Sequence, residues 1–183
     1  KKILDENKIK SCFIKKDYPD QIDEQKLLSK FGKIYVHKNR LEALKKAITE
    51  KYEVAIFDDG LQDKTILYDL SFVCFNKKNL IGNGRLIPSG PLRERLSSLN
   101  KYKNIFLNGV NENNEDFKNN LLKKFPNLKF YETKYKLLNL KELNKDKSFV
   151  IFSGIGNHNT FLDMLNENKF NIIKDIEFPD HYD

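Results

Sequence analysis

Six short apolar runs, separated by stretches of helix-forming residues, constrain the fold of this chain more than any other feature. The runs occupy residues 11–14, 34–36, 54–57, 72–75, 105–107 and 149–152. Each has the length of one strand and is apolar throughout, which is typical of strands buried on both faces of a sheet. Helix-forming residues fill 24–31 and 41–51. Because strands alternate with helices, we predict an α/β fold with a doubly wound parallel sheet.

The order of these segments predicts one domain and the start of a second. A helix is expected over 117–124, and the lysine-rich segment 128–147 that follows is strand-like and then polar. We interpret that segment as a crossing between domains. The prediction is therefore a first domain over residues 1–147 and the start of a smaller α/β domain over residues 148–183.

The chain is basic, with a formal net charge of +7 over 183 residues. Such a charge suits a polyanion, an anionic membrane surface or a phosphorylated substrate. The basic residues are scattered, and neither an RNP-like aromatic pattern nor zinc-finger spacing accompanies them, so no nucleic-acid partner is expected. No segment approaches the roughly 18 apolar residues of a membrane-spanning helix.

The two cysteines, Cys12 and Cys74, lie far apart on apolar runs. Neither the number nor the spacing is typical of a disulfide framework or a zinc site. We predict that both are buried thiols, in a protein of a reducing, cytoplasmic compartment.

An acidic pair ends one of the apolar runs. Asp58, Asp59 and Gly60 directly follow the run at 54–57. Ligands of open α/β sheets bind at the carboxyl ends of strands, and an Asp in that place holds magnesium in P-loop phosphotransferases. The same residues also form ordinary turns, so the pattern alone leaves both interpretations open.

Residues 82–95 form a segment rich in glycine, proline and arginine, which we call the glycine-arginine loop. Its glycines allow close backbone approach to a ligand, and Arg85, Arg93 and Arg95 offer forked donors that suit phosphate oxygens. The alternative is a flexible surface loop with solvated charges. The long irregular stretch favours a binding role.

Two further segments contain residues suited to chemistry. A strand, a glycine turn at 154–157 and a helix follow one another, which suits either anion binding or tight packing. Asp180 and His181 follow Pro179, and His181 is a candidate for moving a proton from a substrate hydroxyl. His37 and His158 are interpreted as a strand-end residue and a loop residue without a catalytic role.

Five short motifs occur in one order along the chain and together resemble those of the tetraacyldisaccharide 4'-kinase family of lipid A synthesis. Residues 58–62 resemble its DDGFQ motif, 82–85 its GNGR, 90–94 its GPLRE, 154–157 its GIGN and 178–181 its FPDH. The resemblance extends from about Ile34 to the last residue. Several motifs in this order are far more specific than any one of them.

The resemblance implies a P-loop NTPase-like kinase that uses ATP and Mg²⁺ to phosphorylate the 4'-hydroxyl of a lipid-anchored disaccharide 1-phosphate. It implies that Asp58 and Asp59 contact the metal and the nucleotide phosphates. Asp23 and His181 would form the catalytic acid-base pair, with Asp20 as a possible stand-in for Asp23. Substrate contacts are implied for Glu24, Asn83, Arg85, Arg93 and Glu94.

The chain departs from the family pattern at several positions. Ile22 and Gln25 replace the glycine and proline expected around Asp23 and Glu24. Leu61, Asp63, Arg95 and His158 stand where the family has Phe, His, Pro and Pro. A Walker A sequence is expected to precede the helix that residues 1–8 finish, so we predict a kinase fragment with little or no activity alone.

The expected location is the cytoplasmic face of the bacterial inner membrane, with peripheral contact to anionic lipid. Two other functions remain open. One is a non-catalytic α/β module that binds anionic lipid or phosphate through the glycine-arginine loop. The other is a glycosyltransferase-like enzyme that uses the acidic pair for metal binding, although such motifs normally have a spacer between their acids.

Overall fold

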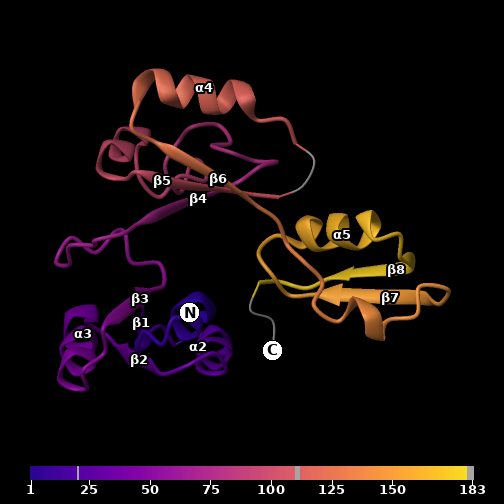
Figure 1. Cartoon of the computed structure of the whole chain (residues 1–183). Coiled ribbons are helices and arrows are strands. Elements are labelled where there is room, and N and C mark those ends of the chain that lie inside the picture. Colours follow the sequence, from indigo (N-terminus) through magenta and orange to yellow (C-terminus); the bar gives the residue numbers. More distant parts are fainter. Residues whose placement is uncertain (20, 110–111, 181–183) are drawn as a thin grey trace. The chain divides into compact units, whose positions relative to one another are not determined.

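The computed structural model describes residues 1–19, 21–109 and 112–180. The chain divides into two compact units, of which the first is Lys1–Tyr68 and the second begins at Asp69 (Figure 1). Every strand pairing recorded among these residues within the sheets is parallel. The chain therefore has an α/β fold with parallel sheets, as the alternation of apolar runs and helical stretches predicts.

The first unit is a three-stranded sheet with helices. Its elements are α1 (Lys2–Glu6), β1 (Ser11–Lys16), α2 (Ile22–Ser29), β2 (Ile34–His37), α3 (Arg40–Thr49) and β3 (Val54–Phe57). The strand order is β2-β1-β3, so β1 is central. α3 starts where the side chain of Asn39 accepts a hydrogen bond from the backbone N–H of Leu41 at 2.9 Å, a typical helix cap.

Alternate residues of β1 face opposite sides of its sheet. Cys12 and Ile14 pack with Ala43 and Ala47 of α3 in one buried cluster. Because side chains alternate along a strand, Phe13 and Lys15 point to the other face. The side chain of Lys15 contacts α2 there. A lysine is thus placed in the interior of the sheet's central strand.

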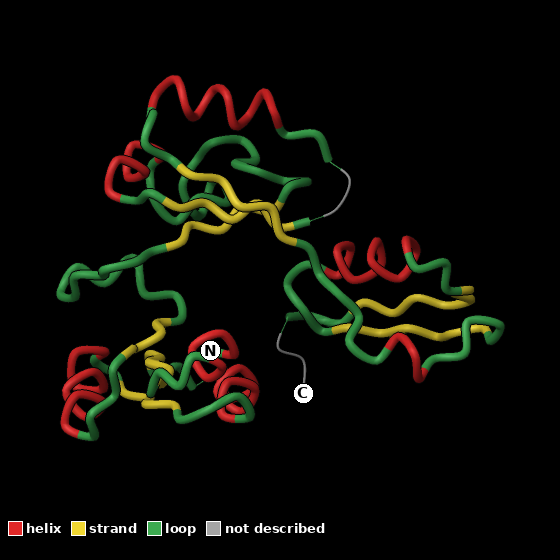
Figure 2. Tube along the Cα trace, viewed as in Figure 1, coloured by secondary structure: helices red, strands yellow, loops and turns green. Residues whose placement is uncertain are grey.

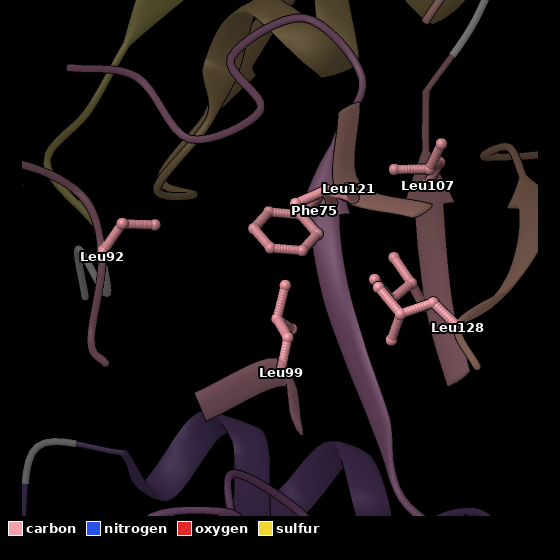
Figure 3. Packing of buried hydrophobic residues seen from close by; sticks show 7 residues of the cluster. Phe75, Leu92, Leu99, Leu107, Leu121 and Leu128 are labelled. Carbon is pink, nitrogen blue, oxygen red and sulfur yellow. The ribbon is translucent and has the colours of Figure 1, made fainter. Parts of the chain in front are cut away.

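The second unit contains a three-stranded and a two-stranded sheet (Figure 2). The first of these consists of β4 (Phe72–Asn76), β5 (Asn104–Asn108) and β6 (Lys129–Thr133), in that order. α4 (Glu115–Lys124) connects β5 to β6, and a 3-10 helix, η1 (Leu96–Lys101), precedes β5. The buried residues of its core are Phe75, Leu92, Leu99, Ile105, Leu107, Leu121 and Leu128 (Figure 3).

The two-stranded sheet pairs β7 (Ser148–Ser153) with β8 (Asn171–Glu177), with a register shift between Phe149 and Val150. A short 3-10 helix, η2 (Leu140–Glu142), precedes β7, and α5 (His158–Glu167) connects the two strands. Ile151, Leu165 and Phe170 form a separate buried cluster. The sequence-based boundary at residue 148 stays a prediction.

The six apolar runs all lie within strands, so these predictions are confirmed. One prediction about the cysteines is wrong. Cys12 is buried, and burial raises the pKa of its thiol to about 11. Cys74 is exposed, because its strand is part of a small sheet whose side chains alternate between a packed and an open face.

Candidate functional site

The acidic pair lies at the carboxyl end of β3, where the parallel sheet of the first unit ends. Phe57, the last residue of β3, pairs with Ile14 of β1. Asp58 is half-buried and Asp59 is exposed. The backbone of Asp59 has a φ of 51°, a left-handed conformation that non-glycine residues adopt at a cost. The predicted position of both carboxylates at a strand end is therefore observed.

Arg40 fixes the backbone of this turn. Its guanidinium is on α3 and only 6% of the residue is exposed. The Nη2 group donates to the carbonyl oxygens of Asp58 at 3.3 Å and of Asp59 at 2.9 Å. Because these bonds use carbonyl groups, Arg40 holds the turn without occupying either carboxylate.

Gly60 is required by close packing at the same turn. A β-carbon at this position would lie 2.8 Å from the phenol oxygen of Tyr68 and 2.9 Å from the Phe57 side chain. The Tyr68 hydroxyl donates to the Gly60 carbonyl at 2.7 Å. The Phe57 and Tyr68 rings meet edge to face, with centroids 5.2 Å apart. Gly60 thus allows Phe57 and Tyr68 to pack closely against the turn that carries the acidic residues.

Lys15 is a site residue that sequence reasoning missed. Its side chain is 2% exposed, and its ammonium donates to Asp58 Oδ2 at 2.6 Å and to Glu24 Oε2. Burial alone would lower the pKa of Lys15, but the hydrogen bonds to Asp58 and Glu24 outweigh burial and raise it above its ordinary value. The only local signal in the sequence is the position of this lysine directly after the apolar run at 11–14.

Asp23, predicted to be catalytic, is exposed in the first turn of α2, beside Glu24. Glu24 and Asp58 share the Lys15 ammonium. The first unit therefore brings the helix turn that carries Asp23 and Glu24 to the acidic strand end. Its predicted partner His181, and the stand-in Asp20, lie outside the described residues.

The carboxylates of Asp58 and Asp59 suit a metal ion whose remaining ligands come from the substrate. Within residues 1–19, 21–109 and 112–180, no three His, Cys, Asp or Glu side chains are grouped to hold a metal ion. Mg²⁺ typically binds one or two carboxylates together with water and substrate phosphates rather than a full protein cage. Asp58 and Asp59 supply oxygen ligands of that kind, so the residues fit Mg²⁺, whose binding stays a prediction.

The glycine-arginine loop is folded around the side chain of Asn83. The Asn83 amide donates to the Ser89 carbonyl at 2.7 Å, and its oxygen accepts from the Arg85 N–H at 3.1 Å. A β-carbon on Gly90 would lie 2.1 Å from the Asn83 oxygen and 2.5 Å from the Arg85 carbonyl oxygen. The loop therefore has internal contacts between Asn83, Arg85, Ser89 and Gly90.

The charged residues of this loop lie on its surface. Arg85 and Arg93 are exposed, and Glu94 is half-buried. Leu92 anchors the loop in the core. Burial, and secondarily the nearby charge of Glu94, raise the pKa of Tyr102. The loop thus has two exposed arginines, and the Asn83 side chain bonds to the loop's own backbone, while its predicted contact with substrate stays a prediction.

The glycine turn at 154–157 meets the Pro179–Asp180 segment. The backbone N–H of Phe178 donates to the Ser153 carbonyl at 2.8 Å. A β-carbon on Gly156 would lie 2.9 Å from a carboxylate oxygen of Asp180. Asn157 caps α5 by accepting from the N–H of Thr160 at 3.2 Å. Two motifs that are about 20 residues apart in the sequence are therefore neighbours.

A second missed cluster supports this turn. His158, which the sequence analysis places in a loop, is instead the first residue of α5 and is 4% exposed. Its Nδ1 lies 2.5 Å from the Ser153 hydroxyl, and its Nε2 lies 2.8 Å from Asp175 Oδ2. The loop prediction is wrong because Asn157 caps the helix, which therefore begins at His158. No local pattern links His158 to Asp175, which lies on the next strand.

No helix among the described residues is long and apolar enough to cross a membrane.

Comparison with known proteins places the motifs in one family. The model of the family described as "Tetraacyldisaccharide-1-P 4'-kinase" matches residues 14–183. A tetraacyldisaccharide 4'-kinase of Pelagibacter ubique is 54% identical over 182 residues, which are 100% of this chain and 58% of the relative. The kinase of the same name from Rickettsia canadensis is 36% identical over 166 residues, covering 87% of this chain and 48% of the relative.

A third relative, the tetraacyldisaccharide 4'-kinase of Wigglesworthia glossinidia brevipalpis, is 33% identical over 156 residues, covering 81% of this chain and 40% of its own length. No solved structure matches the chain. The chain spans about half the length of the curated relatives it matches. Since the family model matches residues 14–183, which are nearly all of the sequence, the chain belongs to the tetraacyldisaccharide-1-P 4'-kinase family.

Proposed function

We propose that this chain supplies the metal-binding and acceptor-binding parts of a kinase that uses ATP to phosphorylate the 4'-hydroxyl of tetraacyldisaccharide 1-phosphate in lipid A biosynthesis. One observation carries the proposal: Asp58 and Asp59 follow a parallel strand, where Lys15 binds the Asp58 carboxylate and Arg40 binds the backbone carbonyls of both residues. Strand ends of this kind are where open α/β sheets bind ligands.

In this proposal Asp58 and Asp59 bind Mg²⁺ and orient the nucleotide phosphates. When bound, Mg²⁺ neutralises charge on the transferred phosphoryl group. Lys15 holds the Asp58 carboxylate and Arg40 holds the backbone of both residues, and positioning is one of the two main contributions that a protein makes to phosphoryl transfer. The parallel sheets are consistent with a P-loop NTPase-like, doubly wound first domain, and we propose that residues 148–183 start a second, smaller α/β domain.

The glycine-arginine loop is the proposed contact to the lipid substrate. Arg85 and Arg93 are exposed on a loop that its own hydrogen bonds hold in shape. One guanidinium group can donate two parallel hydrogen bonds to a phosphate, so Arg85 and Arg93 suit the 1-phosphate of the lipid. Glu24, Asn83 and Glu94 are further proposed substrate contacts, and Asn83 also holds the loop backbone.

Asp23 and His181 are the proposed acid-base pair that takes the proton from the 4'-hydroxyl. Asp23 is exposed in the first turn of α2, where a substrate can reach it. We further propose peripheral contact with anionic lipid at the cytoplasmic face of the inner membrane. The chain's formal charge of +7 favours such contact.

The test uses a complete kinase scaffold. Residues 1–183 replace the matching region of the Pelagibacter ubique enzyme, which is 54% identical over 182 residues. ATP-dependent transfer of ³²P to tetraacyldisaccharide 1-phosphate is then measured for the chimera and for its Asp58→Asn, Asp59→Asn and His181→Ala variants. Transfer by the chimera and a loss of about 100-fold or more in the Asp variants supports the proposal.

The same series separates the proposal from a non-catalytic lipid-binding module. His181→Ala is expected to lower kcat far more than it raises the KM for lipid, because the residue acts in the transition state. A chimera that binds vesicles containing the lipid but transfers no phosphate, next to an active parent enzyme, would favour the binding module instead. The separate chain of residues 1–183 is expected to transfer little or no phosphate.

A further inference from the structure

Lys15 is a buried cation on the central strand of the first unit. Both neighbouring strands pair with β1, and the Lys15 side chain is 2% exposed. Lysine is rarely buried to this degree unless its charge is paired. Its two partners come from different elements, since Asp58 follows β3 and Glu24 is in the first turn of α2.

The geometry gives this ammonium two tasks. Asp58 and Glu24 both contact one Nζ atom, so this ammonium offsets the repulsion between two neighbouring carboxylates. The carboxylates themselves are partly exposed, at the surface of the unit, while the lysine lies beneath them. The cation therefore holds both side chains from inside and leaves their outer sides toward solvent.

We propose that Lys15 is a positioning residue, which fixes the Asp58 carboxylate and locks the first turn of α2, with Asp23 on it, against the carboxyl end of β3. The proposal rests on the proposed function for the role of Asp58 and Asp23 in phosphoryl transfer. In this proposal Lys15 contacts neither nucleotide nor lipid, and it acts by positioning Asp58 and Asp23.

The first test needs no kinase activity. The 183-residue chain is labelled with ¹⁵N, and the ammonium resonances of its lysines are recorded by NMR. The Lys15 ammonium is expected to exchange its protons with water at least 10-fold more slowly than surface lysines such as Lys38. Its resonance should shift in both Asp58→Asn and Glu24→Gln. Fast exchange, or no response to either substitution, overturns the proposal whatever the chimera does.

The second test measures catalysis in the chimera described above. Lys15→Met keeps the length of the side chain and removes its charge, and a misplaced catalytic group lowers kcat by up to about 100-fold. We expect kcat to fall by about 10- to 100-fold with less than a threefold change in the KM for lipid, and Lys15→Arg to recover most of kcat. An unchanged kcat in Lys15→Met overturns the proposal.

Lys77→Met is the matched control. Lys77 is also a buried lysine in an ion pair, with Glu132 at 2.7 Å, but it belongs to the other unit. No hydrogen bond or ion pair joins its side chain to a proposed site residue within the described part of the chain. The Lys77 substitution should lower thermal stability without a selective loss of kcat. Equal losses of kcat in the Lys77 and Lys15 variants would mean that Lys15 acts only through stability, which would overturn the proposal. If the chimera itself is inactive while the NMR result holds, the proposed function fails and the positioning contact stands.

Discussion

The imidazole of His158 joins two segments of the second unit, since its Nε2 lies 2.7 Å from Asp175 Oδ1 and its Nδ1 lies 2.5 Å from the Ser153 hydroxyl. Each ring nitrogen therefore has a polar partner, one on β7 and one on β8. This arrangement ties the end of β7 and the start of α5 to β8.

Replacing His158 should therefore weaken the β7–β8 sheet. His158→Ala leaves a cavity and removes the partner of two polar groups, which typically costs about 1–3 kcal/mol. The free energy of unfolding of the 183-residue chain in urea measures the loss. Lys174→Thr is the control, because Lys174 is exposed on β8 next to Asp175. Its free energy of unfolding should stay within about 0.5 kcal/mol of that of the unchanged chain. Equal stability of the two variants would contradict a structural role for His158.

Gly90→Ala should disrupt the glycine-arginine loop. The added methyl group would overlap the Asn83 side chain and the Arg85 carbonyl oxygen, so the loop must open. We expect faster amide hydrogen exchange at residues 83–92 and weaker binding of the lipid substrate by the chimera.

Gly84→Ala is the comparison for that experiment. A β-carbon on Gly84 would meet nothing within 4 Å, although its φ of +72° makes any side chain strained. This variant should lose about 1 kcal/mol of stability without the change in exchange across the loop. Matching exchange patterns in the two variants would show that crowding at Gly90 does not determine the loop's shape.

Glu132 makes the second unit sensitive to acid. Hydrogen bonds from Lys118 and Lys77 lower the pKa of this carboxyl to about 2, from an ordinary value of 4.5. A carboxyl whose folded pKa is depressed stabilises the fold above its unfolded pKa and loses that contribution as the pH falls through the folded pKa. The contribution of Glu132 should thus be complete above about pH 5 and disappear toward pH 2.

The measurement is the difference in unfolding free energy between the unchanged chain and Glu132→Gln across that pH range. The difference should shrink as the pH falls. Glu142→Gln, which changes an exposed carboxyl of η2, serves as the control. A difference that stays constant from pH 5 to pH 2 would be inconsistent with the depressed pKa.

Arg40→Met should loosen the turn that carries the acidic pair. The substitution removes the donors to the Asp58 and Asp59 carbonyl groups in a buried place, at a cost of about 1–3 kcal/mol. Urea unfolding measures the stability, and kcat of the chimera reports on the carboxylates. Lys46→Met, at an exposed lysine of the same helix, should change neither. Comparable effects of the two substitutions would contradict a specific role of Arg40 in holding the turn.

Much of this fold is predictable from local pattern. Each apolar run became a strand because a strand buried on both faces needs apolar residues at every position, and the run before Asp58 also fixed where the acidic pair lies. The glycine turn and the glycine-arginine loop were recognisable because few other residues tolerate such backbone shapes.

The supporting residues were not predictable in the same way. Lys15, Arg40 and His158 each bind a partner that lies 17 to 43 residues away, and single-sequence periodicity contains no information on such pairs. A lysine after an apolar run indicates the edge of a strand as readily as a buried ion pair. The exposed Cys74 shows the opposite error, since an apolar run in a small sheet still has one open face.

The shared ammonium of Lys15 also constrains how this protein can change over generations. A single substitution of Asp58 or Glu24 would leave a buried positive charge with half its partners, and loss of Lys15 alone would leave two acids facing each other. Each one-step change is therefore expected to be less fit than either the complete triad or its joint replacement. Lineages that retain the lysine should retain both acids, so these three positions are expected to vary together rather than one at a time.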